Sequence, residues 1–273
     1  MDGQAEQLLE RASRQYFGKY RGFVADNEDP EQLARLRLRV PSVLGEEVET
    51  DWALPCLPHG GLTDQGFFTV PEIGAQVWVE FEQGVLSAPI WVGTFWQSAG
   101  DVPQEAQVSP PTSRVFKTTS GHVLEFADES GAEQVRLEHS AGAVLAMDEN
   151  GSVDIEANNG TKLILDASGN KVILENASGH KLVMENSKIT LTDPAGSEIQ
   201  MQGPQVTVKG QIVTVEGTQV ALGGAGGEFL VKGISLMTLF NTHTHIAAAP
   251  GAPTSPPVIP MTPAQLSTTV TTS

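Results

Sequence analysis

Apolar and polar residues alternate in short segments that repeat along the middle of the chain. The clearest copies, NGTKLILDA, SGNKVILENA and SGHKLVMEN, follow one another from Asn159 to Asn186. In each copy, apolar side chains two positions apart share one parity, and Lys with Asp or Glu four residues later share the other. Period-two alternation predicts β-strands with one apolar face and one charged face that stays in water.

Glycines punctuate these strands at regular intervals. They recur every 9 or 10 residues at Gly151, Gly160, Gly169 and Gly179, and then every 7 residues from Gly203 to Gly224. Regular spacing of this kind is typical of a repeat architecture. We therefore predict strands joined by turns from Gly121 to about Leu222.

Each repeat is too short to enclose a core. A β-helix made by one chain closes each coil with three strands, and coils of the hexapeptide type take about eighteen residues. Here one strand and one turn fill the whole period. We expect the strands to find their neighbours in other chains, and infer three copies wound round a shared axis as an intertwined trimeric β-helix.

The first hundred residues follow a different pattern. Residues 3–18 place apolar side chains near helical spacing, which predicts a short amphipathic helix. Strand-like runs then follow, separated by Pro and Gly, at residues 36–40, 66–70, 76–82 and 89–95. Together they indicate five or so short strands in about eighty residues, which favours a small Greek-key barrel. The proline-containing segment from Trp96 to Arg114 predicts a stiffened linker.

Composition narrows the function classes. The formal net charge of −17 argues against nucleic acid or an anionic membrane as a partner. Cys56 is the single cysteine, so no disulfide can form within the chain, and we expect synthesis in a reducing cytoplasm. The N-terminus lacks a signal-peptide pattern. The most apolar late segment, FLVKGISLMTLF, is too short to span a bilayer.

The order of the motifs carries a family resemblance. YRGFV, DNEDP, ARLRLRVPSVLG, WALPC, GFFTVPEIGAQVWVEFEQG and PIWVGTFW succeed one another from Tyr20 to Trp96. This order resembles the barrel of the phage baseplate assembly protein V and VgrG family, which has the oligonucleotide/oligosaccharide-binding (OB) fold. The segment Ser120–Gly142 resembles the beginning of that family's β-helix. The resemblance covers roughly residues 16–257.

The resemblance implies an all-β protein: an N-terminal OB-fold barrel followed by an intertwined trimeric β-helix spike with a metal-stabilised apex. The implied function is that of a structural, non-enzymatic central spike of a contractile phage tail or contractile injection system. It would join a separate baseplate hub protein to the tip and pierce the target cell envelope on contraction. The expected organisation is an N-terminal helix (1–18), a barrel (19–97), a linker (98–114), a spike (115–240), an apex (241–260) and a C-terminal tail (261–273).

His243 and His245 are the candidate metal ligands. They stand two apart in NTHTHIAAAPGAPTSPP, so in an extended segment both imidazoles point to the same side, and three chains would bring six round one axis. Six nitrogen donors suit an octahedral divalent transition metal such as iron or nickel better than structural zinc, which takes four ligands. The resemblance implies an iron ion, because family spikes that end in His-x-His before a Pro- and Gly-rich apex hold iron there. We predict a structural iron shared by three chains and no catalytic residue.

Several alternatives remain open at this stage. A trimeric β-helical depolymerase of surface polysaccharide could pair acidic residues as glycosidase carboxylates, but these residues recur at turns and outward positions of the repeat. They are Asp128, Glu129, Asp148, Glu149, Asp154 and Glu156. An oligonucleotide binder could use Arg35, Arg37 and Arg39 with Trp78, but Glu80 and Glu82 beside Trp78 would repel a phosphate backbone.

For the remaining candidate residues we favour a structural or solvated role over a functional one. Cys56 and His59 lack further ligands nearby, and His122, His139 and His180 stand beside turns or strand ends, where we expect them to be solvated. For the tail after Met261 three roles stay open: wrapping back on the tip, remaining unstructured, or contacting a tip or cargo protein.

Overall fold

The computed structural model describes residues 15–217, 233–243 and 259–262. The chain divides into two compact units, Met1–Thr207 and Val208–Ser273, which are considered separately. Most of the expected N-terminal helix, apex and tail lie outside the described residues. No helix in the described part of the chain is long and apolar enough to cross a bilayer.

Residues 20–94 form a five-stranded sheet in the order β2-β1-β4-β5-β3. The strands are β1 (Tyr20–Asp26), β2 (Arg37–Arg39), β3 (Leu54–Pro55), β4 (Gln76–Phe81) and β5 (Pro89–Thr94), with the short helix α2 (Pro41–Leu44) after β2. Isolated bridges join Leu36 to Ala53 and Arg39 to Glu49. The segment before β3 therefore lies against β2, while β3 itself pairs with β5 at the other edge.

Alternating side chains from these strands and the segments beside them make the core. Nine buried residues form one cluster: Val24, Leu36, Leu38, Val40, Ala53, Val77, Val79, Phe81 and Trp91. Gly22 lets β1 approach its neighbours, because a Cβ there would lie 2.8 Å from Val79 Cγ2 and 3.1 Å from the Arg39 carbonyl oxygen. The strand expected at residues 66–70 does not form, and this segment belongs to the long β3–β4 loop.

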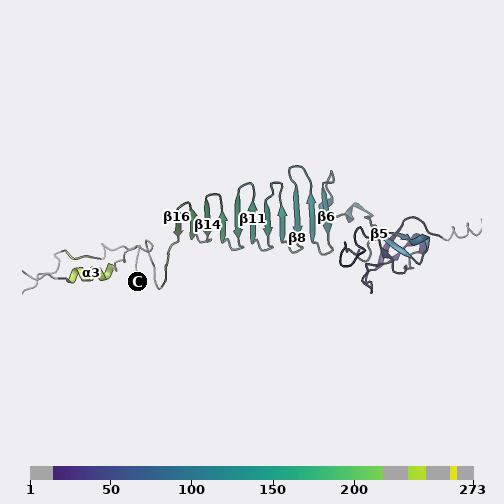
Figure 1. Cartoon of the computed structure of the whole chain (residues 1–273), viewed down its shortest axis with the longest axis horizontal. Helices are drawn as coiled ribbons and strands as arrows, with labels where there is room; N and C mark the ends of the chain where they lie inside the picture. Colours follow the sequence, from purple (N-terminus) through teal and green to yellow (C-terminus); the bar gives the residue numbers. More distant parts are fainter. Residues whose placement is uncertain (1–14, 218–232, 244–258, 263–273) are drawn as a thin grey trace, which may run out of the picture. The chain divides into compact units, whose positions relative to one another are not determined.

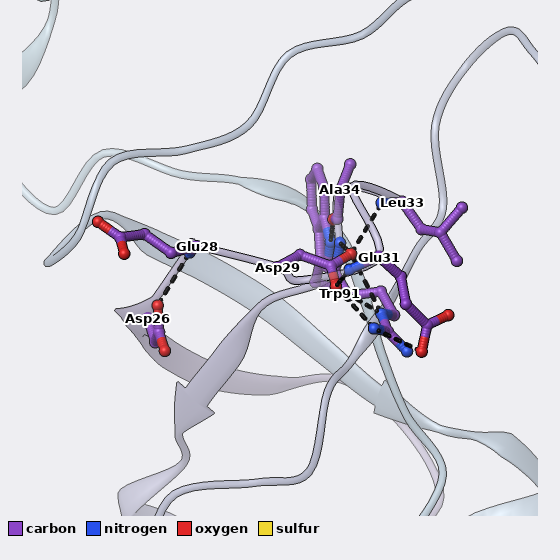
Figure 2. Close-up of polar contacts among 8 residues, drawn as sticks. Asp26, Glu28, Asp29, Glu31, Leu33, Ala34 and Trp91 are labelled. Carbon is purple, nitrogen blue, oxygen red and sulfur yellow. Dashed lines mark hydrogen bonds and ion pairs between the residues drawn. The ribbon is translucent and has the colours of Figure 1, made fainter.

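The DNEDP motif builds the β1–β2 loop around the carboxylate of Asp29 (Figure 2). This side chain is only 3% exposed and accepts the backbone N–H groups of Glu31, Leu33 and Arg35. The Arg35 guanidinium donates to both carboxylate oxygens, at 2.6 to 3.1 Å. These contacts hold the pKa of the Asp29 carboxyl well below its ordinary value, and the hydrogen bonds from Arg35 have the largest effect.

The same loop is tied to the core from its other side. Trp91 Nε1 donates to the Ala34 carbonyl oxygen at 2.9 Å (Figure 2). Gln32 and Ala34 adopt positive φ angles of 56° and 61°, which non-glycine residues hold only where their surroundings fix them. We conclude that the Asp29 contacts supply this constraint.

Replacing Asp29 by Asn should loosen this loop. Because the pKa is lowered in the folded state, the charged carboxylate stabilises the fold at neutral pH, and the effect fades as the pH falls below the ordinary carboxyl range of about 4. We expect the Leu33 and Arg35 amides to exchange with solvent roughly tenfold faster in Asp29→Asn at pH 7, measured by hydrogen exchange. The difference from wild type should shrink towards pH 3.

Asp26→Asn is the matched control, since Asp26 lies in the same region and accepts only the Glu28 N–H, at 2.9 Å (Figure 2). Equal exchange rates in the two variants would contradict the central role of Asp29.

The following strands form an eleven-stranded antiparallel sheet in strict sequence order, from β6 to β16 (Figure 1). Its strands are β6 (Ser113–Lys117), β7 (Val123–Ala127), β8 (Gln134–Glu138), β9 (Val144–Met147), β10 (Val153–Glu156), β11 (Lys162–Asp166), β12 (Lys171–Glu175), β13 (Lys181–Met184), β14 (Lys188–Thr192), β15 (Glu198–Gln202) and β16 (Gln205–Lys209). Each strand pairs with its own sequence neighbours. The expectation that the strands must find hydrogen-bonding partners in other chains is therefore wrong, because hairpins within the chain already satisfy them.

A five-residue turn module sets these hairpins. At Asp148 the side-chain Oδ1 accepts the N–H groups of Asn150 and Ser152, and Gly151, with φ of 77°, donates back to the Asp148 carbonyl. Asn176 and Asp193 occupy the same position in their turns. His139 also does so, since its Nδ1 accepts the Ala141 N–H at 3.1 Å. Gly151, Gly160, Gly169 and Gly179 thus lie in hairpin turns, as their spacing predicts. The predicted run of strands to about Leu222 is wrong at residues 210–217, since β16 is the last strand and no strand forms there.

Within the second unit, Gly233–Thr242 form helix α3. The expected β-helix spike, residues 115–240, covers most of this segment, and the helix corrects that expectation. Residues 234–240, ISLMTLF, carry apolar side chains at both parities, so a period of two and a period of 3.6 fit equally well. Asn241 exchanges two hydrogen bonds with the Met261 backbone, at 2.7 and 2.8 Å, so the beginning of the tail returns to α3.

Candidate functional site

One face of the eleven-stranded sheet is apolar from end to end. The strand register places Phe116, Leu124, Leu137, Leu145, Ile155, Leu163, Leu174, Leu182, Leu191 and Ile199 in one row across β6 to β15. A second row runs beside it, with Phe126, Val135, Met147, Val153, Leu165, Val172, Met184, Ile189 and Met201. We call these two rows the apolar face.

The apolar face is largely open to solvent in the single chain. Leu174 is 49% exposed, and most residues of the first row are similarly exposed. Among the residues that the structure describes, no layer packs on this face, and Figure 1 shows the sheet as a single layer. Monomeric proteins rarely leave a contiguous apolar surface of this extent in water, and such surfaces mark protein contacts.

The opposite face carries charges arranged across the strands. Glu175 lies between Lys162 and Lys181, at 3.8 and 3.5 Å, and Glu185 lies between Lys171 and Lys188, at 3.6 and 3.5 Å. These partly exposed ion pairs are individually weak. They flank a central row that contains Ile164, Ile173 and Val183, so this face mixes charged and apolar side chains, whereas the two rows of the other face are apolar throughout.

The predicted metal ligands are only partly described. His243 directly follows α3, where its N–H donates to the Leu239 carbonyl oxygen at 3.0 Å and its ring lies 5.4 Å from that of Phe240. His243 therefore ends a helix, whereas the sequence analysis assumed an extended segment. His245 lies outside the described residues. Within those residues, no three side chains that could bind a metal come together.

The minor candidates have structural partners. His122 and His139 lie 4.4 Å apart between ring centroids, and each accepts a turn N–H through Nδ1. Arg37 lies near Glu49 at 4.0 Å, and Arg35 and Arg37 both stack on Trp52. Asp148 stabilises its own hairpin turn, and the hydrogen bond from the Ser152 N–H is the largest cause that lowers the pKa of its carboxyl.

Sequence reasoning missed one surface feature of the barrel. Arg21 lies over the rings of Trp78 and Phe95, at 5.8 and 5.5 Å from their centroids, and the two rings are 4.7 Å apart. Arg21 and Trp78 are register partners on β1 and β4. Their sequence separation hides this contact, which only the strand pairing brings about.

Two family models match the chain. Residues 20–96 match the type VI secretion system/phage-baseplate injector OB domain, and residues 152–214 match the phage baseplate V C-terminal trimerisation domain. The chain is a phage baseplate V/VgrG-like protein. No curated protein matches it.

The two matches fit the two parts of the fold. The OB domain of this baseplate V-like protein coincides with the β1–β5 sheet, which confirms the expected barrel family. The trimerisation domain spans β10 to β16 and so contains much of the apolar face. This match supports a homotrimer and a place in a baseplate.

The apolar face predicts a sharp difference between adjacent residues. Leu174 lies on it, whereas Ile173 lies on the charged face. Leu174→Asp should abolish the trimer at micromolar concentration, because burying an unpaired carboxylate costs on the order of several kcal/mol per ion. Ile173→Asp, the matched control, should remain trimeric in native mass spectrometry. Trimer loss in both variants, or in neither, would contradict this assignment.

Proposed function

We propose that three copies of this chain form the central spike of a contractile phage tail or contractile injection system. The observation that carries this proposal is the uncovered apolar face within a region that matches a trimerisation domain. Three such faces turned towards one axis would bury each other and leave the three charged faces in water. The trimeric β-helix expected from the sequence would then be a prism of three meandering sheets, held by side-chain burial.

The role we propose is mechanical. On contraction the spike would be driven through the target cell envelope with its C-terminal end leading, and the OB barrels would stay attached to a separate hub protein. An outer face of Lys and Glu pairs needs no insertion into lipid, and this agrees with the acidic composition. The protein would be made in the cytoplasm and become a component of a virion baseplate or injection particle. A tip or cargo protein at its far end is a further proposed partner.

The parent particle offers a direct test. Particles assembled with Leu174→Asp should lack the spike, whereas particles with Ile173→Asp should contain three copies and penetrate target cells normally. Purified trimer should release no reducing ends from capsule or lipopolysaccharide. Release of reducing ends would favour the alternative, a polysaccharide depolymerase, and normal penetration by particles without the spike would contradict the piercing role.

We further propose that His243 and His245 bind a structural iron ion at the apex. The donor set fits such an ion, because two imidazoles from each of three chains supply six nitrogen ligands. His243 Nδ1 lies against the Phe240 carbonyl oxygen, a contact of the kind that fixes the ring orientation of metal-binding histidines. The metal would add folding free energy where three chains end with little core.

Metal analysis tests this site. We expect one iron per three chains in purified wild-type trimer, and none in His243→Ala or His245→Ala, both of which should remain trimeric. His180→Ala is the control, because His180 pairs with Asp193 at 3.2 Å in a turn of the sheet. Iron that persists in the apex variants, or wild-type trimer without stoichiometric metal, would remove the proposal.

A further inference from the structure

The long loop between β3 and β4 presents apolar side chains on an ordered tip. The Phe67 N–H donates to the His59 carbonyl oxygen at 3.0 Å, and Leu62 bridges to Gln65. The two arms approach closely, since a Cβ added to Gly66 would lie 3.2 Å from Gly60 Cα. On this tip, residues 60–68, Leu62 is 74% exposed and Phe68 is 66% exposed. The loop thus holds large apolar groups out in water.

A cavity of about 1130 Å³ opens beside the base of the same loop. Its apolar walls come from Leu57 and Val70 in the loop, Phe95 and Trp96 after β5, and Phe116 in β6. Two polar contacts link the elements round it: Thr119 Oγ1 donates to Glu72 at 2.9 Å, and Lys117 Nζ to Glu105 at 2.7 Å. None of residues 60–68 lines it, so the loop tip does not fill the cavity of its own chain.

The cavity is continuous with the face on which the chains associate. Phe116 lines the cavity and also begins the first row of the apolar face. A neighbouring chain packed on that face would therefore lie next to the cavity. Trp96 is 62% exposed in the single chain and would become less exposed when a neighbouring chain packs there.

Threefold symmetry demands two different complementary surfaces. In a ring of three identical chains each contact joins one patch of a chain to another patch of the next, and the third contact closes the ring. The projecting tip and the hollow form such a pair. We propose that the loop tip, residues 60–68, of one copy seats in the cavity of the next copy, so that the three barrels are locked into a ring. This inference rests on the proposed trimer.

The single native cysteine gives a direct test. Cys56 is free, exposed and lines the cavity. In Leu62→Cys the loop tip of each copy carries a second thiol, which should lie near Cys56 of the next copy. A short bis-maleimide should then convert most of the purified trimer to a covalent species of three times the chain mass on denaturing gels.

Three controls separate the possible arrangements. Wild type and Leu62→Cys/Cys56→Ser each have one thiol per chain and can form at most covalent dimers. Leu33→Cys places a thiol at another exposed apolar residue, in the β1–β2 loop, and should give no covalent trimer. Covalent dimers from Leu62→Cys/Cys56→Ser would show the tips meeting one another at the axis, and would overturn the proposal.

Native mass spectrometry before crosslinking tests the trimer separately from the contact between loop tip and cavity. A trimeric Leu62→Cys that gives no covalent trimer overturns the tip-in-cavity contact and leaves the spike intact. A monomeric wild-type chain overturns both. Leu62→Asp supplies a second readout: the trimer should persist, because the apolar face holds it, but Trp96 should become more accessible to an aqueous fluorescence quencher than in wild type.

Discussion

The constraint on which this structure depends is an apolar sheet face that no described residue of the chain covers. The meander pairs every inner strand on both sides within one chain, so only the edge strands β6 and β16 keep a side without a strand partner in the described sheet. What remains is apolar area, and a sheet one layer thick has no core beneath it. In the proposed trimer, folding of the sheet and association of the chains would therefore be coupled, and the stability of this region would depend on protein concentration.

Register is the second requirement, because a slip of one residue would turn every apolar side chain to the charged face. Two features of the sequence prevent such a slip. The turn modules at Asp148, Asn176 and Asp193 fix where each hairpin reverses. The cross-strand pairs of Glu175 and Glu185 with lysines favour one alignment over its neighbours. Each ion pair is weak in stability, but all of them favour the same register.

The alternation in the sequence predicted the repeated strands and which of their side chains share a face, since a period of two determines both. It could not identify the partner of a strand: the same pattern fits pairing within a chain or between chains. The helix at Gly233–Thr242 was not predicted for a related reason, because its apolar residues fit both the strand period of two and the helix period of 3.6. Asp29 was part of a recognised motif, but its organising role arises from contacts with Arg35 and backbone N–H groups that only folding brings together.

The turns also bear on stiffness, the property that the proposed role requires. Side chains at each edge of the sheet join a turn to the next turn along the same edge. The Ser140 N–H donates to His122 Nδ1 at 3.2 Å, and the Ala167 and Ala177 N–H groups donate to Ser152 and Thr161 hydroxyls at 3.3 Å. Each such bond spans two strands, so bending the sheet between them would stretch it. Under a load along the strand order, the ladder bonds would resist separation of strands and these edge bonds would resist buckling, and in the proposed trimer the apolar face would keep three sheets in contact. Stiffness would therefore follow from the same short period that leaves a single chain without a core.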